Sequence, residues 1–154
     1  MKKIFAIALV CALALGLAAC GGSAPKTMDI DAVKAQIMEN VKPVDPLDLP
    51  ADRLAELYGI AAEDVKKSAC FITMGGSFPD EVVIVEAVDS AAAGRIAEKL
   101  QKRLDDVTNQ AQNYDADQFA LLKKCKVQRI GSYLALFISA ENAAMQNIFA
   151  NAAK

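Results

Sequence analysis

The stretch EVVIVEAVDSAAAGRIAEKLQKRLDDVTNQAQNY, residues 81–114, decides the fold. Its opening run is rich in β-branched residues, which predicts a strand over 81–88. Asp89 or Ser90 then suits the N-cap of a long helix over 89–114. The apolar residues of this helix form one stripe: Ile96, Leu100, Leu104 and Val107. The other faces of the helix are charged, so it needs an apolar sheet face to cover.

The flanking segments predict a second strand pair and four further helices. The first hairpin pairs strand 81–88 with a strand over SACFITM (68–74), and the loop GGSFPD (75–80) joins them. The second hairpin pairs strands 125–130 and 133–140 around a turn at Gly131-Ser132. Helical spacing and end signals place the remaining helices at 29–41 (capped by Asp29), 48–60 (Leu54 and Leu57 inward), 116–125 and 141–153.

These elements predict an α+β fold for a single globular domain over residues 29–154. We expect an antiparallel four-stranded sheet made from two hairpins, each followed by a helix. The helices are expected to pack on one face of the sheet, and 29–41 and 48–60 form an N-terminal helical pair. Alternation along the strands directs one set of apolar side chains toward the long helix: Val83, Val85, Ala87, Leu134, Leu136 and Ile138.

The first twenty residues, MKKIFAIALVCALALGLAAC, have the layout of an export signal: two lysines, an apolar run and then small residues. The apolar run of residues 4–17 is shorter than the roughly 20 residues that a membrane-spanning helix needs. LAAC (17–20) resembles a bacterial lipobox. The resemblance implies cleavage of signal peptide 1–19 and a thioether link between Cys20 and diacylglycerol. The alternatives are a retained membrane helix, or an accidental cysteine in an ordinary signal.

Residues 20–28 follow as a lipid-anchored tether, because glycine, serine and proline in GGSAPKT oppose regular structure. The whole chain has a formal net charge of −2, and losing Lys2 and Lys3 with the signal makes the remainder more negative. A mildly acidic domain is poorly suited to nucleic acid or to anionic lipid head groups. We therefore expect no nucleic-acid partner, and contact with the membrane through the N-terminal lipid.

The sequence nominates no catalytic residue, metal site or cofactor. It contains no histidine, which excludes Ser-His-Asp and Cys-His catalysis and metal sites that need histidine. It has no tryptophan to floor a sugar site and no phosphate-binding or dinucleotide-binding glycine pattern.

One loop is a candidate binding site, formed by Gly75, Gly76, Ser77, Asp80 and Glu81. Its backbone N–H groups could cradle an anion, but the loop joins two strands and carries two carboxylates, so a plain hairpin loop is favoured. Adjacent carboxylates in a strand point to opposite faces, so Asp80 and Glu81 are expected to be a solvated loop end. Lys102-Arg103 and Asp105-Asp106 are expected on the outer face of the long helix as solubility charges.

Cys70 and Cys125 are candidates for a disulfide, because an exported domain can keep one. They would occupy equivalent positions if the two hairpin–helix units were a repeat. The favoured interpretation is two small buried apolar residues, because two thiols in a sequence do not reveal their separation.

Three segments carry a resemblance to a known family: LYGI (57–60), GGSFPDEVVIVEAVDSAAAGRIAEKLQKRLDD (75–106) and GSYLALFISAENA (131–143). On these the chain resembles lipoproteins of Gram-positive bacteria in domain-of-unknown-function family 4358. The resemblance implies an exported lipoprotein on the outer face of the cytoplasmic membrane, and it implies no activity.

The sequence combines a lipid anchor, a tether and a small domain without a set of catalytic residues. This combination predicts a non-catalytic binding or accessory module at the cell envelope, which recognises an envelope protein or another envelope component. One alternative is an envelope enzyme that uses carboxylate or hydroxyl groups. The other is a passive structural lipoprotein.

Overall fold

The computed structural model describes residues 27–75 and 78–153. The predicted signal peptide, Cys20 and most of the predicted tether lie outside the described residues, as do Gly76 and Ser77. The strands are β1 Pro46–Leu49, β2 Val65–Ser68, β3 Cys70–Thr73, β4 Glu81–Ala87, β5 Val127–Ile130 and β6 Tyr133–Ile138. The helices are α2 Ile30–Val41, α3 Arg53–Tyr58, α4 Ser90–Tyr114, α5 Ala116–Leu122 and α6 Asn142–Ala152, with the short 3₁₀ turn η1 at Ala62–Asp64.

The predicted α+β class is confirmed, but the predicted number of strands is wrong. The described residues form one antiparallel sheet of six strands in the order β1-β3-β4-β6-β5, with β2 also paired to β4. The two additional strands are short. β1 takes the first residues of the predicted helix 48–60, and β2 is the polar segment VKKS. The two hairpins meet where β4 pairs with β6 in the centre of the sheet.

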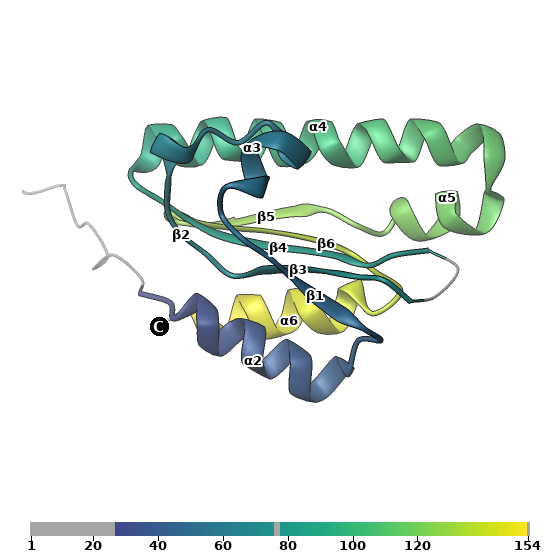
Figure 1. Ribbon diagram of the computed structural model, residues 1–154, viewed down its shortest axis with the longest axis horizontal. Helices are drawn as coiled ribbons and strands as arrows, with labels where there is room; N and C mark the ends of the chain where they lie inside the picture. Colours follow the sequence, from purple (N-terminus) through teal and green to yellow (C-terminus); the bar gives the residue numbers. More distant parts are fainter. Residues whose placement is uncertain (1–26, 76–77, 154) are drawn as a thin grey trace, which may run out of the picture.

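The prediction that the helices pack on one face is also wrong. In Figure 1, α3, α4 and α5 lie on one side of the sheet, and α2 and α6 lie on the other. The central strands explain this arrangement, because all six residues of β6 and the first five of β4 are buried. A strand that is apolar on both faces needs a helical layer on each side.

Each face of the sheet therefore has its own core. The core beneath α4 contains the predicted inward set of strand residues, Val83, Val85, Ala87, Leu134, Leu136 and Ile138. The core beneath α2 and α6 contains their neighbours, with Phe137 and Phe149 in edge-to-face contact at a centroid distance of 6.2 Å. The helices that follow the two hairpins, α4 and α6, thus cover opposite faces.

The long helix agrees with its prediction. The Asp89 carboxylate accepts a hydrogen bond from the Ala92 N–H at 2.7 Å, and the predicted stripe from Ile96 to Val107 is buried. Asp29 likewise caps α2. The predicted N-terminal helical pair is wrong, because α2 and α3 lie on opposite faces. Among the described helices, none is both long enough and apolar enough to cross a membrane.

Candidate functional site

Three polar side chains from separate elements meet in the core beneath α4, and we call them the Glu81 cluster. Glu81 is the first residue of β4, Arg103 lies midway along α4, and Tyr58 ends α3. The Tyr58 hydroxyl donates to Glu81 Oε2 at 3.1 Å. Arg103 Nε donates to the same oxygen at 3.1 Å, and Arg103 Nη2 donates to Glu81 Oε1. Both carboxylate oxygens are therefore occupied.

Local sequence explains how each member reaches this point. Glu81 shares a strand face with Val83, which directs it toward α4. Arg103 follows Leu100 by three residues, so it borders the buried stripe of its helix. Tyr58 is held at the end of α3 because Gly59 adopts φ 66°, and the Gly59 N–H donates to the Ala55 carbonyl at 3.0 Å. Glycine adopts that left-handed conformation without the steric cost of a Cβ atom.

The cluster is largely removed from solvent. Glu81 is 8% exposed and Tyr58 is 7% exposed. Burial raises the pKa of the Tyr58 hydroxyl, and the neighbouring Glu81 carboxylate raises it further. The hydrogen bonds to Glu81 raise the pKa of the Arg103 guanidinium. Both shifts keep these groups protonated, and Arg103 also lies over the Tyr58 ring, 5.9 Å from its centroid.

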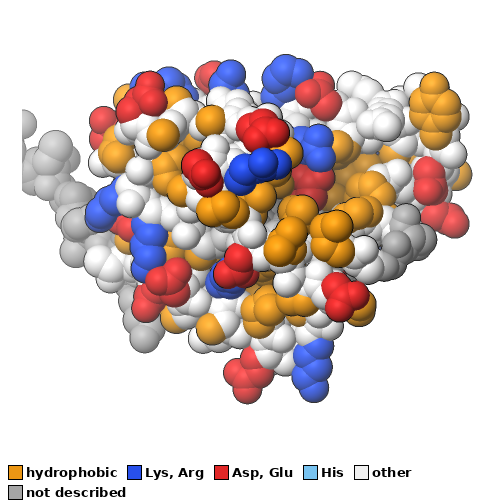
Figure 2. Space-filling model, viewed as in Figure 1, with side chains coloured by type: hydrophobic (Ala, Val, Ile, Leu, Met, Phe, Trp, Pro, Cys, Tyr) orange, Lys and Arg blue, Asp and Glu red, His pale blue; other side chains and the backbone are white. Residues whose placement is uncertain are grey.

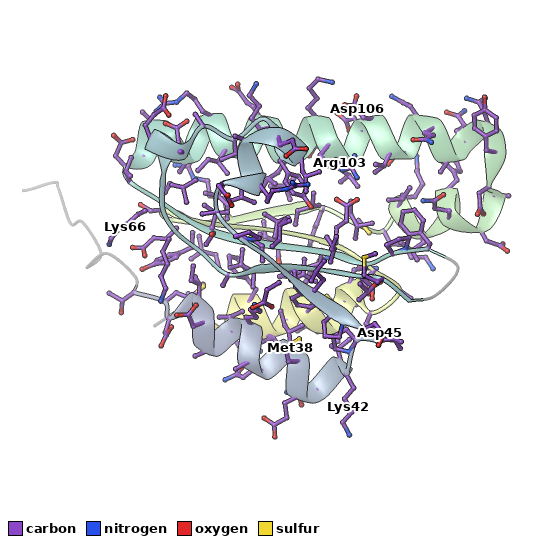
Figure 3. All side chains as sticks on the ribbon, in the orientation of Figure 1. Met38, Lys42, Asp45, Lys66, Arg103 and Asp106 are labelled. Carbon is purple, nitrogen blue, oxygen red and sulfur yellow. The ribbon has the colours of Figure 1, made fainter. Side chains whose placement is uncertain are left out.

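Two expectations about these charges are wrong. Glu81 is not part of a solvated loop end, because it is buried and ion-paired. Arg103 does not lie on the outer face of the long helix. Figure 3 shows Arg103 on the sheet side of α4 and Asp106 on the outward side. Lys102 and Asp106 form an exposed pair at 2.7 Å, as expected of solubility charges.

A cavity of about 270 Å³ opens beside the cluster, between α4, α5 and the segment before β4. Its lining combines an apolar part with polar groups, and consists of Phe78, Pro79, Glu81, Arg103, Val107, Gln110 and Gln118. Arg103 also borders a second hollow of about 240 Å³ on the side of Tyr58 and Lys102. Arg103 thus lies between two depressions along α4.

The candidate binding loop is divided by the structure. Glu81 lines the cavity, whereas Asp80 belongs to the other side of the sheet end, near Ser139 and Glu141. The Asp80 N–H donates to Thr73 Oγ1 at 2.7 Å, and burial raises the pKa of the Asp80 carboxyl. Gly75 lies beside Val44. Among the described members of the loop, only Glu81 therefore contributes to the cavity.

The two cysteines of the domain are both buried free thiols in the core beneath α4. The Cys70 thiol donates to the Ile84 carbonyl at 3.5 Å, and the Cys125 thiol donates to the Leu121 carbonyl at 3.6 Å. Burial raises the pKa of Cys70 to about 11, and it also raises the pKa of Cys125. Within residues 27–75 and 78–153, no three Cys, Asp or Glu side chains form a group that could hold a metal ion.

The fold and the site define a class of domain: one antiparallel sheet between two helical layers, with a buried Tyr–Glu–Arg cluster beside a cavity. Residues 40–139 match the family model described as Domain of unknown function (DUF4358), and the chain belongs to this family. No curated protein and no solved structure gives a significant match. The matched range contains all three residues of the Glu81 cluster and every residue that lines the cavity.

Reasoning from the sequence missed this cluster, although two signals pointed to it. Tyr58 lies in LYGI, and Glu81 and Arg103 lie in the segment 75–106, so all three fall within the stretches that carry the family resemblance. Arg103 also falls within the helical spacing of the apolar stripe. A charged residue at such a position suggests a buried partner, and a glutamate that opens a buried strand is a suitable one.

Proposed function

We propose that this protein is a lipid-anchored binding module on the outer face of the cytoplasmic membrane, and that the cavity beside Glu81 is its binding site. Cys20 would carry the diacylglyceryl group, and residues 20–28 would connect it to the domain. The signal-like layout of residues 1–19 and the LAAC sequence support the anchor. Two acyl chains on one glycerol are enough for stable attachment.

The observation that carries the binding role is the composition of the cavity wall. Phe78, Pro79 and Val107 supply apolar surface, while Arg103 and two glutamines supply polar groups. Apolar lining with a few placed polar groups is typical of binding sites. The Glu81 carboxylate accepts hydrogen bonds from Tyr58 and Arg103, so its charge is already paired within the cluster.

The protonation of the cluster favours binding over acid–base catalysis. A general acid or base works best with a pKa near the operating pH. The pKa of Tyr58 is raised by burial and that of Arg103 by its bonds to Glu81, and both shifts lead away from neutral pH. The cluster therefore suits the role of a fixed, neutral wall.

The anchor is tested by replacing one cysteine at a time in living cells. Cys20→Ser should abolish lipidation and shift the protein from the detergent phase to the aqueous phase in a detergent-partition assay. Cys11→Ser, within the same signal, is the matched control and should leave both properties unchanged. If Cys20→Ser keeps its acyl mass, the anchor assignment is wrong.

The binding role is tested by photocrosslinking on intact cells. A photoreactive amino acid at Gln110, which lines the cavity, should give a discrete adduct with an envelope component. The same amino acid at Glu39, exposed on α2 on the opposite side of the sheet, should give none. Equal labelling from both positions, or no adduct from Gln110, would contradict a binding site in this cavity.

A further inference from the structure

We infer that the ligand of the cavity is an extended segment of polypeptide that inserts one apolar side chain. This inference rests on the proposed binding role and specifies the chemistry of the partner. The segment would continue from the cavity across the end of the sheet, over three neighbouring side chains that we call the apolar shelf: Leu47, Ile72 and Met74.

The polar groups of the cavity match an uncharged amide main chain. Gln110 on α4 and Gln118 on α5 both line the cavity, and because Gln110 is exposed and Gln118 is half-buried, their side-chain amides are accessible to a ligand. A glutamine amide offers both donors and an acceptor, as a peptide unit does. Two such groups can therefore form hydrogen bonds with the main chain of a bound segment, whatever its side chains are.

The charge of the cavity wall also favours an uncharged peptide main chain as the ligand. The Glu81 carboxylate already accepts from Tyr58 and from two nitrogens of Arg103, so the ion pair is internally neutralised. The Arg103 side chain is still 36% exposed. Its guanidinium has five N–H groups, of which Glu81 takes two, so it can donate to a carbonyl oxygen of the ligand. A neutral wall of this kind gives no strong attraction to a free anion.

The register of the sheet connects the cavity to the apolar shelf. Glu81 lies opposite Ile72, and Ile72 lies opposite Leu47, so these three residues form a row across β4, β3 and β1. Neighbouring strands are about 4.8 Å apart, so the row spans about 10 Å, the length of roughly three extended residues. Met74 directly follows β3, two residues after Ile72.

The shelf is exposed because the helical layer ends before it. α3 has only six residues, and α4 passes over β4, β5 and β6. Leu47 is consequently 54% exposed and Met74 is 68% exposed. Figure 2 shows hydrophobic side chains gathered on this face below the long helix, with charged side chains distributed around them. Flexible methionine side chains adapt to varied apolar partners.

The size of the cavity also favours a segment of a longer chain. Its volume of about 270 Å³ is at the lower end of the roughly 300–1,000 Å³ that is typical of small-ligand sites. One apolar side chain with its peptide unit would suit this space, and the shelf would receive its neighbours. A small soluble ligand would leave the shelf uncovered.

Addition of a partner strand at the β1 or β2 edge is less compatible with the structure. The β1 edge begins at Pro46, which cannot donate a hydrogen bond, and is followed by Pro50. The β2 edge carries Lys66 and Lys67, paired with Glu86 and Asp31 at 2.7 and 2.6 Å. Proline and lysine at sheet edges oppose strand addition. The cavity and shelf thus suit a peptide better than the β1 and β2 edges do.

The test uses the full-length chain in detergent micelles and capped heptapeptides of glycine and serine with one central leucine, phenylalanine or lysine. Leucine and phenylalanine peptides should shift the NMR signals of the Gln110 and Gln118 side-chain amides and of the Met74 methyl group. The variant Gln110→Ala/Gln118→Ala should bind about tenfold more weakly. Asn109→Ala/Asn113→Ala, with both changes on exposed residues of α4, is the matched control and should bind normally.

Three outcomes would overturn the inference. The first is that no peptide shifts these signals. The second is that the lysine peptide binds as tightly as the leucine and phenylalanine peptides. The third is that free leucine or an N-acetylglucosamine oligomer shifts the glutamine signals and leaves the Met74 signal unchanged. A positive photocrosslink from Gln110 together with a failed peptide titration would mean a binding module for another class of ligand. Failure of both experiments would reject the binding role itself.

Discussion

Arg103 places its guanidinium on the carboxylate of Glu81, and this contact joins the middle of α4 to the start of β4 across 22 positions of the chain. The Glu81 side chain is 10% exposed, so the pair is buried from one side and open from the other. An arrangement of this kind contributes little by simple attraction, because both charges lose water when it forms. Its main consequence is that neither partner can be removed alone without a cost.

Replacing Arg103 should therefore destabilise the domain. We expect Arg103→Leu to lower the free energy of unfolding by about 2–3 kcal/mol, because it leaves the Glu81 carboxylate buried without its cation. Urea denaturation followed by circular dichroism measures this. Lys102→Leu, which breaks an exposed pair one position earlier, should cost less than about 0.5 kcal/mol. Equal losses for the two variants would show that Glu81 does not depend on Arg103.

Tyr58→Phe should lower the free energy of unfolding by about 1–2 kcal/mol at pH 7, because the Glu81 carboxylate loses one donor. The pKa of the Tyr58 hydroxyl is raised in the folded state above its usual value of about 10. The contribution of the neutral phenol is therefore complete below pH 10 and is lost as the pH rises beyond it.

The alkaline side of the stability–pH profile is the second measurement on this variant. The profile of the unmodified protein should fall more steeply above pH 10 than that of Tyr58→Phe. Tyr114→Phe, at a side chain that is 86% exposed, is the control and should follow the unmodified protein. Parallel alkaline profiles for the unmodified protein and Tyr58→Phe would be inconsistent with a buried, hydrogen-bonded phenol.

Asp80 should show the opposite effect on stability. Burial raises its pKa, and Glu141 adds to the rise, while a hydrogen bond from Ser139 opposes it. The folded state therefore binds a proton more tightly than the unfolded state, so the ionised carboxyl opposes folding at neutral pH. We expect Asp80→Asn to raise the thermal midpoint at pH 7 and to make little difference below about pH 4. Asp105→Asn, at an exposed position on α4, should change neither value.

The thiols of Cys70 and Cys125 should react slowly with alkylating reagents in the folded protein at pH 8, because both are buried and both pKa values are raised. In urea both should react fully. Mass spectrometry of the digested protein, with and without reductant, should find the two cysteines alkylated on separate peptides. A peptide pair joined through Cys70 and Cys125 that disappears with reductant would show a disulfide instead.

The long-range organisation of the sheet was predictable only where the sequence patterns were strong. Strand 81–88 and helix 89–114 were predicted because β-branched residues and a long apolar stripe leave few alternatives. β1 and β2 were missed because PLDL and VKKS have only four residues each, too few for an alternation of apolar and polar residues to predict a strand. Their pairing depends on partners that lie far along the chain.

The two helical layers were missed for a related reason. YLALFI is apolar at every position, which is typical of a strand buried on both faces, but only one set of alternate residues was assigned a partner. The cluster was missed because Arg103 and Glu81 look like surface charges when each is considered with its sequence neighbours. Their partnership arises from packing α4 onto β4, which no local pattern describes.

The position of the first described residues gives the molecule a direction. α2, which begins three residues into the described range, starts toward one end of the long axis, and the turn between α4 and α5 lies at the other end (Figure 1). α4 runs along this axis and, with 25 residues, is about 37 Å long. On the proposed anchor, the cavity would lie away from the bilayer, at a distance to which the length of α4 contributes as well as residues 20–28. Shortening the tether would then lower the binding site without closing it.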